Sequence, residues 1–391
     1  MIIQNKKTLN TIYKYLKGDK AIWFVVLLLA VLSLLVVYSS IVTLAYKHHE
    51  GNTGYYLFRH GIFLIVGLTL VFVIHKVPFN YFSRISQLAL FISIPLLLLT
   101  LVMGENINEA SRWLKIPIID QTFQTSDMAK LALIMYVARM LSIKQEHISD
   151  FRNAFLPVVI PVCIVCLLIL PANFSTAAVL FSSCFVLMFI GRVPIKFLLL
   201  LIGSGILAIA LVFLVATAFP KVFPRAQTWI HRVENFQKKE IDSKKNYQVE
   251  QSKIAIATGG IVGKGPGKST QRNFLPHPYS DFIFAIVIEE YGIFGGLMVV
   301  LLYLILLYRS IRISNKCPRT FGTLLAIGIS FSLVFQAMIN MAVAVNLLPV
   351  TGQALPMISM GGTSIWFTCI AIGIVLSVSS GMEAIEKTIT H

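Results

Sequence analysis

Charged residues are scarce in this sequence. Only 13% of its 391 residues are Asp, Glu, Lys or Arg, whereas a soluble globular domain usually has about 25%. Hydrophobic residues take their place and make up 57% of the chain, with a mean hydropathy of +0.79. A surface with so few charges cannot face water over most of its area. The composition therefore excludes a soluble enzyme that is merely anchored to a membrane.

Acidic residues are the scarcer charged type. The chain has 17 Asp and Glu against 33 Lys and Arg, which gives a formal net charge of +16. In a soluble domain this excess would suggest a nucleic-acid partner. In a membrane protein, basic residues flank the spans and meet anionic lipid headgroups. We therefore expect no nucleic acid as a partner.

Recognisable metal and redox sites are also lacking. Of five cysteines, Cys163 and Cys166 form a CxxC pair, but this pair lies within an apolar run with no histidine nearby. Such cysteines usually serve as small buried hydrophobic residues. No dense cluster of metal ligands stands out, so no metal site or cofactor is firmly predicted. We expect no cleavable signal peptide either, because the first apolar run is too long and no small-residue cleavage site follows it.

Long apolar stretches are abundant instead. Ten of them are bounded by charges or by Pro and Gly, and each approaches the ~20 residues that cross a bilayer as a helix. The predicted fold is an all-α polytopic membrane protein that forms a single domain over residues 1–391. Segments 1–20 and 381–391 are the predicted cytoplasmic ends, and 219–280 is a large extracytoplasmic loop between the seventh and eighth helices. The predicted spans are 21–46, 56–74, 86–103, 126–141, 155–170, 174–190, 196–218, 281–308, 321–345 and 363–380.

The orientation follows from the basic residues near the short loops. An even number of spans places both termini on one side, and seventeen Lys and Arg residues lie on that side against four on the other. Basic residues in short loops stay in the cytoplasm, whereas long loops cross largely regardless of charge. Both termini are therefore predicted to be cytoplasmic. The four residues of the opposite side are Lys47, Arg59, Arg112 and Lys115.

A glycine-rich, basic stretch forms the second half of the long loop. Glycines allow close backbone approach, free N–H groups bind anionic oxygens, and cationic side chains add charge. A phosphate or pyrophosphate is the natural ligand, although a flexible surface loop would have the same composition. A Walker nucleotide loop is excluded, since its spacing requires glycine where this chain has Val262. The residues concerned are Gly259, Gly260, Gly263, Gly265 and Gly267, with Lys264, Lys268 and Arg272.

Asp281 directly follows this stretch and precedes an apolar run. Aspartate is a favoured N-cap of helices, so capping is one role for it. A carboxylate at the membrane edge, next to a phosphate-binding loop, can also act as a general base. The two roles are compatible, and the residues alone leave both open.

Ionisable residues also occur inside the predicted spans. Glu289 and Glu290 lie two turns into the eighth span, where such groups are costly and usually face a cavity or a partner. Lys130 of the fourth span and Arg59 of the second are candidate partners. Asp127 and Lys130 share one helix face at i and i+3 and can neutralise each other. A structural ion cluster and a proton pathway both fit this pattern.

The stretch before the tenth span is interrupted by two prolines and three glycines. Such a break at membrane depth is tolerated only against protein or a water-filled cavity. The interruption over residues 346–364 predicts either a re-entrant segment that lines a substrate groove or a simple kinked turn. Ser359, Thr363 and Ser364 would offer hydroxyl groups to a polar ligand.

The long loop with the start of the eighth span, and the interrupted stretch before the tenth span, resemble the SEDS family (shape, elongation, division and sporulation). The resemblance extends over nearly the whole chain and is strongest to the members that serve cell division, with the rod-shape members as the near alternative. The family's essential loop aspartate matches Asp281, and its Arg-Trp before the fourth span matches Arg112-Trp113. The resembling residues are Gln251 through Asp281-Phe-Ile-Phe-Ala to Glu289-Glu290-Tyr-Gly292, together with Leu348-Pro-Val-Thr-Gly352, Leu355-Pro356 and Ser359-Met-Gly-Gly-Thr363.

Two positions depart from the family pattern. The family's Gln-Pro-Ser-Glu at the start of the fourth span is Gln124-Thr-Ser-Asp127 here, so the carboxylate is kept on a shorter side chain. The Pro-Asp that often opens the sixth span corresponds to Pro171-Ala-Asn173, which lacks the charge.

The resemblance implies a peptidoglycan glycosyltransferase in a bacterial cytoplasmic membrane, at the division septum. It implies lipid II, an undecaprenyl-diphosphate-linked disaccharide-pentapeptide, as substrate. A class B penicillin-binding protein (a transpeptidase) and other divisome membrane proteins would be partners. Asp281 would be the base, and Lys264, Lys268, Arg272, Arg225 and Arg112 would surround the pyrophosphate. A divalent cation, Mg²⁺ or Mn²⁺, would fit between Asp281 and the pyrophosphate, although no ligand cluster requires it.

Two other classes of function compete with a polymerase. A lipid II flippase would use carboxylates at mid-membrane rather than at the outer end of a span. A division scaffold would only recruit partners through its loops, which leaves the glycine–lysine stretch without a purpose. We favour the polymerase.

Overall fold

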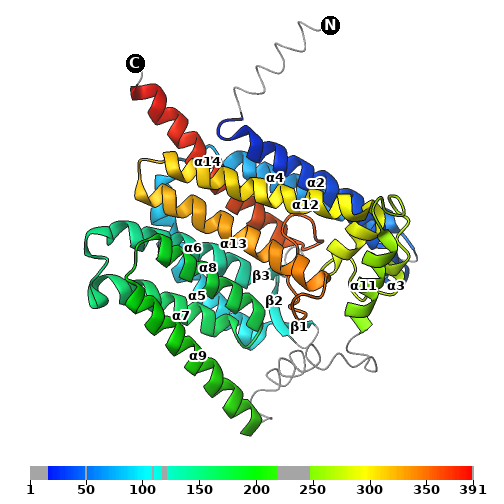
Figure 1. Cartoon of the computed structure of the whole chain (residues 1–391), viewed down its shortest axis with the longest axis horizontal. Helices are drawn as coiled ribbons and strands as arrows, with labels where there is room; N and C mark the ends of the chain where they lie inside the picture. Colours follow the sequence, from blue (N-terminus) through cyan, green and yellow to red (C-terminus); the bar gives the residue numbers. More distant parts are fainter. Residues whose placement is uncertain (1–15, 49–50, 108–109, 117–120, 219–246, 390–391) are drawn as a thin grey trace, which may run out of the picture.

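The computed structural model describes residues 16–48, 51–107, 110–116, 121–218 and 247–389. Long helices make up most of this part of the chain, and they lie along one axis in an elongated bundle (Figure 1). The helices are α2 (Lys20–Ser40), α3 (Val42–His48), α4 (Thr53–Ile74), α5 (Asn80–Met103), α6 (Thr125–Ile143), α7 (Leu156–Ile169), α8 (Phe174–Ile190), α9 (Ile195–Ala218), α11 (Tyr247–Gly259), α12 (Ile283–Lys316), α13 (Thr320–Ala344) and α14 (Thr363–Ile389).

Nine of the ten predicted spans each coincide with one of these helices, and the first coincides with two, α2 and α3. Seven candidate spans are long and apolar enough to cross a membrane, and α8 and α9 contribute shorter apolar helices. The remaining span, α6, carries charged residues and packs among α5, α8 and α13, which places its polar face inside the bundle. The protein is thus a helical multi-pass membrane protein, as predicted.

Helix ends differ from the prediction in three places. The first span is two helices, because α2 ends at Ser40 and α3 begins at Val42. Helices α12 and α14 continue to Lys316 and Ile389, well beyond the apolar stretches that predicted them. Hydropathy marks where a segment leaves lipid, whereas a helix continues into water as long as its backbone hydrogen bonds are kept.

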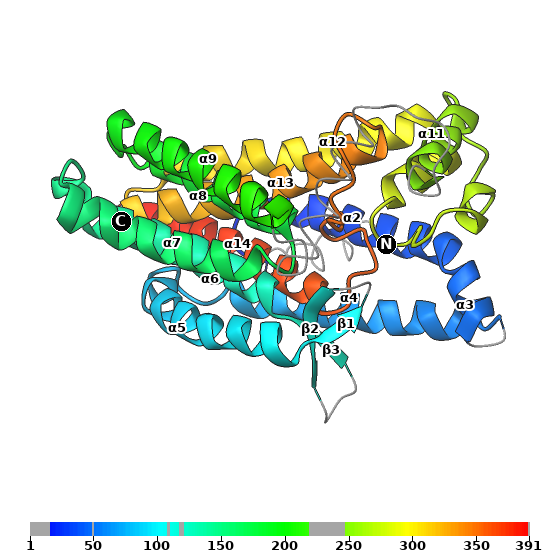
Figure 2. The same ribbon diagram turned by 90° about the horizontal axis from the view of Figure 1, so that it is seen from below.

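Helix α13 lies at the centre of the bundle, where it packs against α6, α8, α12 and α14. At one end of the bundle, the Asp19 carboxylate caps α2 by accepting hydrogen bonds from the backbone N–H groups of Ala21 (2.9 Å) and Ile22 (3.2 Å). Its second oxygen accepts from Nε of Arg309 at 2.8 Å, which joins α2 to α12. We call the opposite end, where α12 begins and where α11 lies, the outer end, following the predicted orientation (Figures 1 and 2).

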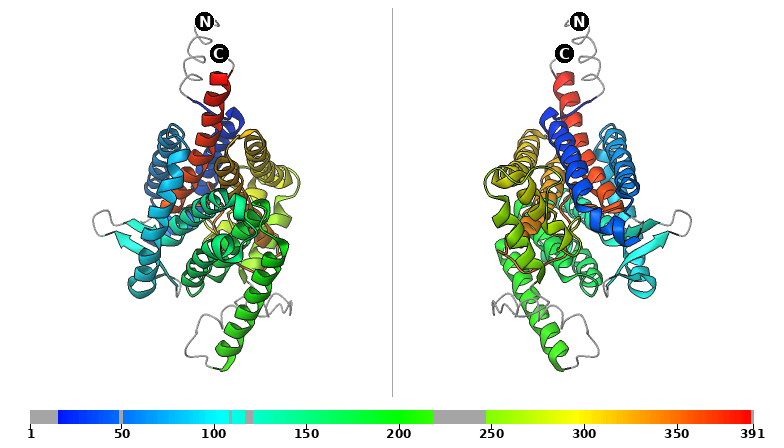
Figure 3. Two further views of the ribbon diagram at one scale, coloured as in Figure 1. Left: turned by 90° about the vertical axis from the view of Figure 1, so that its left-hand side faces the viewer. Right: turned by 90° about the vertical axis from the view of Figure 1, so that its right-hand side faces the viewer.

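Helix α9 leans away from the bundle. Leu198 and Leu201 of its first half are buried, but its later residues Ile206, Leu207 and Leu211 are more than half exposed. Figure 3 shows α9 leaving the other helices as it proceeds toward its C-terminal end.

A small sheet at the outer end was not predicted. Strands β1 (Glu105–Ile107), β2 (Ala110–Ile116) and β3 (Gln121–Gln124) form an antiparallel sheet in the order β1-β2-β3 between α5 and α6. The sheet packs against α14, where the rings of Phe123 and Phe367 lie 5.5 Å apart. The all-α prediction missed it because about twenty residues between two spans lack an extended alternating pattern.

The second half of the long loop is folded against the bundle. Residues 219–246 lie outside the described part of the chain. From Tyr247 onward, the loop forms α11 and the short 3₁₀ turn Gln271–Asn273, and α11 packs along α12. The glycine-rich stretch is therefore an ordered part of the bundle's outer end.

Candidate functional site

Asp281 stands in a turn immediately before α12. The helix begins at Ile283, and its N-cap residue Phe282 has no side-chain capping bond. The capping role that aspartate could have had is therefore wrong. The half-buried carboxylate accepts one hydrogen bond, from Oγ of Ser280 to its Oδ1 (2.8 Å), and Oδ2 has no hydrogen-bond partner in the described part of the chain. One carboxylate oxygen thus remains available to a substrate.

The backbone around Asp281 is held by two distant segments. The amide nitrogen of Asn340 in α13 donates to the carbonyl oxygen of Asp281 at 2.9 Å. The Ser359 hydroxyl donates to the carbonyl oxygen of Ser280 at 2.7 Å, and the N–H of Met360 donates to that of Tyr279 at 2.9 Å. The interrupted stretch before α14 therefore packs directly against the turn that carries Asp281.

The Tyr279 side chain lies close to this carboxylate. Burial raises the pKa of its phenol above the ordinary value, and the neighbouring Tyr56 and Asp281 raise it further. The phenol consequently stays protonated at neutral pH and can donate a hydrogen bond.

The interrupted stretch is non-helical over most of its length, as predicted. Of its three predicted ligand hydroxyls, two are engaged within the protein: Ser359 with Ser280, and Thr363 with the carbonyl oxygen of Thr122 at 3.1 Å. The third residue, Ser364, lines a cavity. Only Ser364 therefore has the placement that we predicted for all three.

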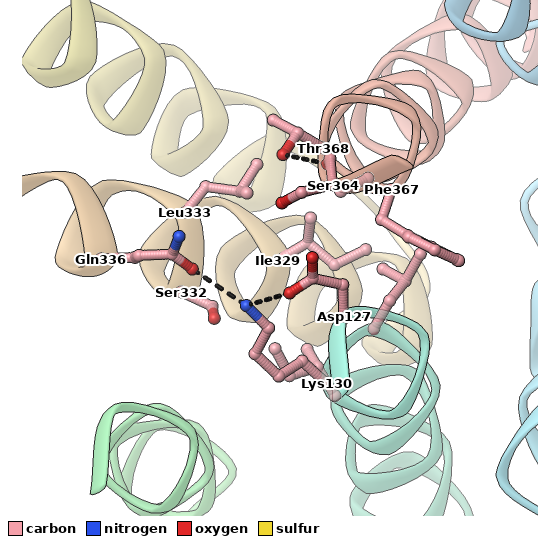
Figure 4. A pocket seen from close by; sticks show the side chains of 12 residues that line it. Asp127, Lys130, Ile329, Ser332, Leu333, Gln336, Ser364, Phe367 and Thr368 are labelled. Carbon is pink, nitrogen blue, oxygen red and sulfur yellow. Dashed lines mark hydrogen bonds and ion pairs between the residues drawn. The ribbon is translucent and has the colours of Figure 1, made fainter. Parts of the chain in front are cut away.

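This cavity lies between α6, α13 and α14 and has an empty volume of about 430 Å³, part of it open to the outside. Asp127 and Lys130 project into it, with the ammonium 2.7 Å from Oδ1 of Asp127 (Figure 4). The predicted pairing of these two residues is confirmed. The ammonium also donates to Oε1 of Gln336 at 3.1 Å, whereas Oδ2 of the buried Asp127 has no hydrogen-bond partner among the residues that the structure describes.

Glu289 belongs to a separate group, which corrects the single ion cluster that we expected. Its partner is Lys264 at 2.6 Å, rather than Lys130 or Arg59. The buried carboxylate also accepts from the N–H (3.0 Å) and hydroxyl (2.9 Å) of Thr270 and from neighbouring N–H and hydroxyl groups of the same loop. Arg59 lies half-buried on α4.

Glu290 is bound by the same loop. It accepts from the Ser269 N–H at 3.3 Å and from the Ser39 hydroxyl of α2. The guanidinium of Arg272 donates to the Ser39 carbonyl oxygen at 3.1 Å and to the Gly267 carbonyl oxygen at 3.0 Å. The anion-binding groups of the loop therefore hold two carboxylates of α12.

Glycine in this loop permits close contact between backbones. Helix α12 is broken at Gly292, which has φ 69° and ψ −170°, a region open essentially only to glycine. A Cβ on Gly292 would lie 2.1 Å from the Ile261 carbonyl oxygen, and one on Gly263 would lie 2.2 Å from that of Glu290. Across this contact, the N–H of Lys264 donates to the Glu289 carbonyl oxygen at 2.9 Å. The loop thus closes the break in α12.

Three more cationic residues were predicted to surround the pyrophosphate. Lys268 is exposed. Arg112 lies in β2, whereas Arg225 lies outside the described residues. Within the described ranges, no three His, Cys, Asp or Glu side chains are grouped so that they could hold a metal ion.

Sequence reasoning missed Gln336 and Asn340. Both lie on α13 one turn apart, and each donates to the segment before α14: Gln336 to the Ala354 carbonyl oxygen (2.9 Å) and Asn340 to that of Gln353 (2.7 Å). Two amides spaced i and i+4 in an apolar span were the available signal, since buried polar groups in a membrane need partners.

Curated relatives match this chain over nearly its whole length. It is 32% identical to the probable peptidoglycan glycosyltransferase FtsW of Trichlorobacter lovleyi, over 96% of this chain and 97% of the relative. It is 34% identical to the stage V sporulation protein E of Bacillus subtilis, over 92% and 96%.

Solved structures share the fold. A chain of a peptidoglycan synthase complex superposes with a TM-score of 0.72 at 26% identity, covering 93% of this chain and 98% of its own. An aspartate-to-alanine mutant of the rod shape determining protein RodA from Thermus thermophilus gives 0.65 at 25% identity, covering 93% and 97%. The cell cycle protein family model of FtsW, RodA and SpoVE matches residues 19–383, which include the helices from α2 to α13, most of α14 and the turn of Asp281. The chain therefore belongs to the FtsW/RodA/SpoVE family of cell cycle proteins.

Proposed function

We propose that this protein is a peptidoglycan glycosyltransferase that polymerises lipid II at the outer face of the bacterial cytoplasmic membrane. The observation that carries the proposal is the half-buried Asp281 carboxylate at the outer end of α12, with one oxygen free of hydrogen bonds from the described residues. Membership of a family whose curated relatives are named as probable peptidoglycan glycosyltransferases supports the reaction class.

In this reaction, the 4-hydroxyl of one sugar attacks the anomeric carbon of the donor sugar. The new carbon–oxygen bond forms as the bond from that carbon to the lipid pyrophosphate breaks. Asp281 takes the proton of the attacking hydroxyl, and the electron pair of the broken bond leaves with the pyrophosphate. A single base suffices for direct displacement with inversion, because pyrophosphate is already a good leaving group.

The departing pyrophosphate needs positive charge. Lys268 is the loop cation whose exposure suits this role, and Arg112 and Arg225 remain candidates. Lys264 and Arg272 bind within the loop, so we assign them to its shape.

We further propose that both termini are cytoplasmic and that the protein acts in septal synthesis with a class B penicillin-binding protein and other divisome membrane proteins. The peptidoglycan synthase complex among the similar structures supports a partnered enzyme. A rod-elongation role is the alternative, since the rod shape determining protein RodA has the same fold.

A lipid II flippase is the second candidate function. The observation that favours it is the cavity with the Asp127–Lys130 pair inside the bundle, where one Asp127 oxygen has no hydrogen-bond partner in the described ranges. A transporter would depend on this pair rather than on Asp281.

The test uses the purified protein, with and without a class B penicillin-binding protein, incubated with labelled lipid II and assayed for glycan strands. Asp281→Asn keeps the size and polarity of the side chain but removes the base, so we expect polymerisation to fall by about 10²–10⁴-fold with lipid II binding retained. Asp281→Glu should recover little, because the longer side chain displaces the carboxylate.

The matched control is Asp150→Asn, the same chemical change at the opposite end of the bundle, where Asp150 caps the turn before α7. Asparagine caps as well as aspartate, so this variant should polymerise normally. Near-normal polymerisation by Asp281→Asn, with unchanged melting temperature and lipid II affinity, would refute the base and favour the flippase.

A further inference from the structure

Three consecutive backbone carbonyl groups in the turn that contains Asp281 are hydrogen-bonded to other segments. The carbonyl oxygens of Tyr279, Ser280 and Asp281 each accept a hydrogen bond from outside the turn, from the N–H of Met360, the hydroxyl of Ser359 and the amide of Asn340. The turn is neither helix nor strand, and its one local backbone bond among the described residues is from the Ser280 N–H to the His277 carbonyl oxygen at 3.1 Å. The three external donors therefore tie the position of the Asp281 backbone to α13 and to the stretch before α14.

The Asp281 carboxylate has little other support. It does not cap α12, and its one hydrogen bond with the described residues comes from the neighbouring Ser280 hydroxyl, which belongs to the same turn. Any displacement of the turn would therefore move the carboxylate and its hydrogen-bond donor together. The position of the base depends on the donors that bind the backbone.

Asn340 joins the Asp281 turn to the stretch before α14. Its side chain is buried, and its amide nitrogen donates both to the Asp281 carbonyl oxygen (2.9 Å) and to the Gln353 carbonyl oxygen (2.7 Å). Both partners are acceptors, so the nitrogen rather than the oxygen must face them. Its own Oδ1 is buried and has no hydrogen-bond partner within the described part of the chain. The two hydrogen bonds that the amide nitrogen donates therefore fix the orientation of the Asn340 side chain, although this orientation leaves its oxygen without a bond.

Ser359 holds the turn from the interrupted stretch before α14. Its hydroxyl donates to the Ser280 carbonyl oxygen and accepts from the Leu355 N–H at 2.8 Å, so it has no free hydrogen for a ligand. Gln336, one turn from Asn340, binds the carbonyl oxygen of Ala354 in the same interrupted stretch. Helix α13 thus fixes the interrupted stretch, and this stretch in turn donates hydrogen bonds to the turn.

We propose that Asn340 and Ser359 are positioning residues, which fix the turn Tyr279–Asp281 so that the Asp281 carboxylate reaches the attacking hydroxyl. The proposal rests on the proposed role of Asp281 as the base, and it assigns Ser359 to the placement of that base rather than to contact with the substrate. Misplacement of a reacting group by about 1 Å can lower a rate about 10²-fold.

The test compares kcat and KM for lipid II in purified Asn340→Leu and Ser359→Ala. We expect kcat per folded molecule to fall about 10- to 100-fold in Asn340→Leu and less in Ser359→Ala, with KM changed less than about threefold. The control is Ser252→Ala, which removes a buried hydroxyl bond of 2.7 Å to the Ala344 carbonyl oxygen at the end of the same α13. Its kcat should equal that of the unaltered protein.

A second comparison combines Asn340→Leu with Asp281→Asn. If Asn340 acts through Asp281, the double variant should retain the residual rate of Asp281→Asn, because residues that act as one unit are not additive. A further fall of the same factor as in the single variant would overturn the proposal, as would an unchanged kcat in Asn340→Leu. Full activity of Asp281→Asn alone would instead refute the proposed function, so the two failures are distinguishable.

Discussion

Removing the Lys264 ammonium should destabilise the protein before it affects the reaction. The ammonium lies 2.6 Å from a carboxylate oxygen of the fully buried Glu289. At an effective dielectric constant of about 20, the attraction at this distance is about 6 kcal/mol before the cost of desolvation. Breaking a buried pair typically costs about 3–5 kcal/mol. Lys264 is 27% exposed, and Glu289 keeps the hydrogen bonds from Ser269, Thr270 and Gln271, so we expect Lys264→Met to cost about 2–3 kcal/mol.

The assay measures thermal unfolding in detergent together with lipid II polymerisation per folded molecule. Lys264→Met should unfold several degrees lower, while its polymerisation rate per folded molecule stays within about threefold of the original. Lys268→Met is the matched control: it removes the same charge from an exposed side chain of the same loop, and should change the free energy of unfolding by less than about 0.5 kcal/mol. Adding Glu289→Gln to Lys264→Met should restore much of the loss, because no unpaired buried charge remains.

The opposite pattern would refute this reasoning. If Lys264→Met unfolds at the original temperature and polymerisation is lost, the ammonium binds the substrate, and the contact with Glu289 does not contribute to stability. If the double variant is no more stable than Lys264→Met, the ion pair is not the source of the loss.

Three further predictions concern the break in α12, the Asp127–Lys130 pair and the orientation in the membrane. Gly292→Ala should prevent stable folding, since it combines backbone strain with a Cβ 2.1 Å from a carbonyl oxygen. Gly260→Ala, where a Cβ meets nothing within 4 Å, should lower the free energy of unfolding by only about 1–2 kcal/mol. Equal melting temperatures of these two variants would contradict the prediction. Lys130→Met should lower the melting temperature before it lowers turnover per folded molecule; unchanged stability with lost turnover would make the Asp127–Lys130 pair part of the reaction or of a proton path. In a variant without native cysteines, an impermeant maleimide should label a cysteine at the exposed Val262 from outside but not one at the exposed Glu146, and the reverse labelling would invert the proposed topology.

The sequence by itself predicted the positions and the order of the ten helices that correspond to its apolar stretches. Such stretches predict helices because a span must satisfy its backbone hydrogen bonds within a helix. Within the described residues, hydropathy and length alone mark seven of them as able to cross a membrane. The Asp127–Lys130 pair was equally predictable, since i and i+3 positions meet on any helix. The interruption over 346–364 followed from its two prolines and three glycines, because proline removes a backbone donor and glycine disfavours a helix.

Only the tertiary structure decided which groups meet across the chain. The glycine-rich loop has the composition of a phosphate site, yet its N–H groups and Lys264 bind Glu289 and Glu290, because the break at Gly292 brings α12 against the loop. A sequence shows that a segment can bind an anion, but not which anion reaches it. From the sequence, Asp281 could have capped α12 or not. The structure decided this, because α12 begins at Ile283, so that Phe282 rather than Asp281 is the N-cap residue. Asn340 and Ser359 contact this turn from 59 and 79 residues away, and contacts at such separations depend on how helices pack, which no local pattern encodes.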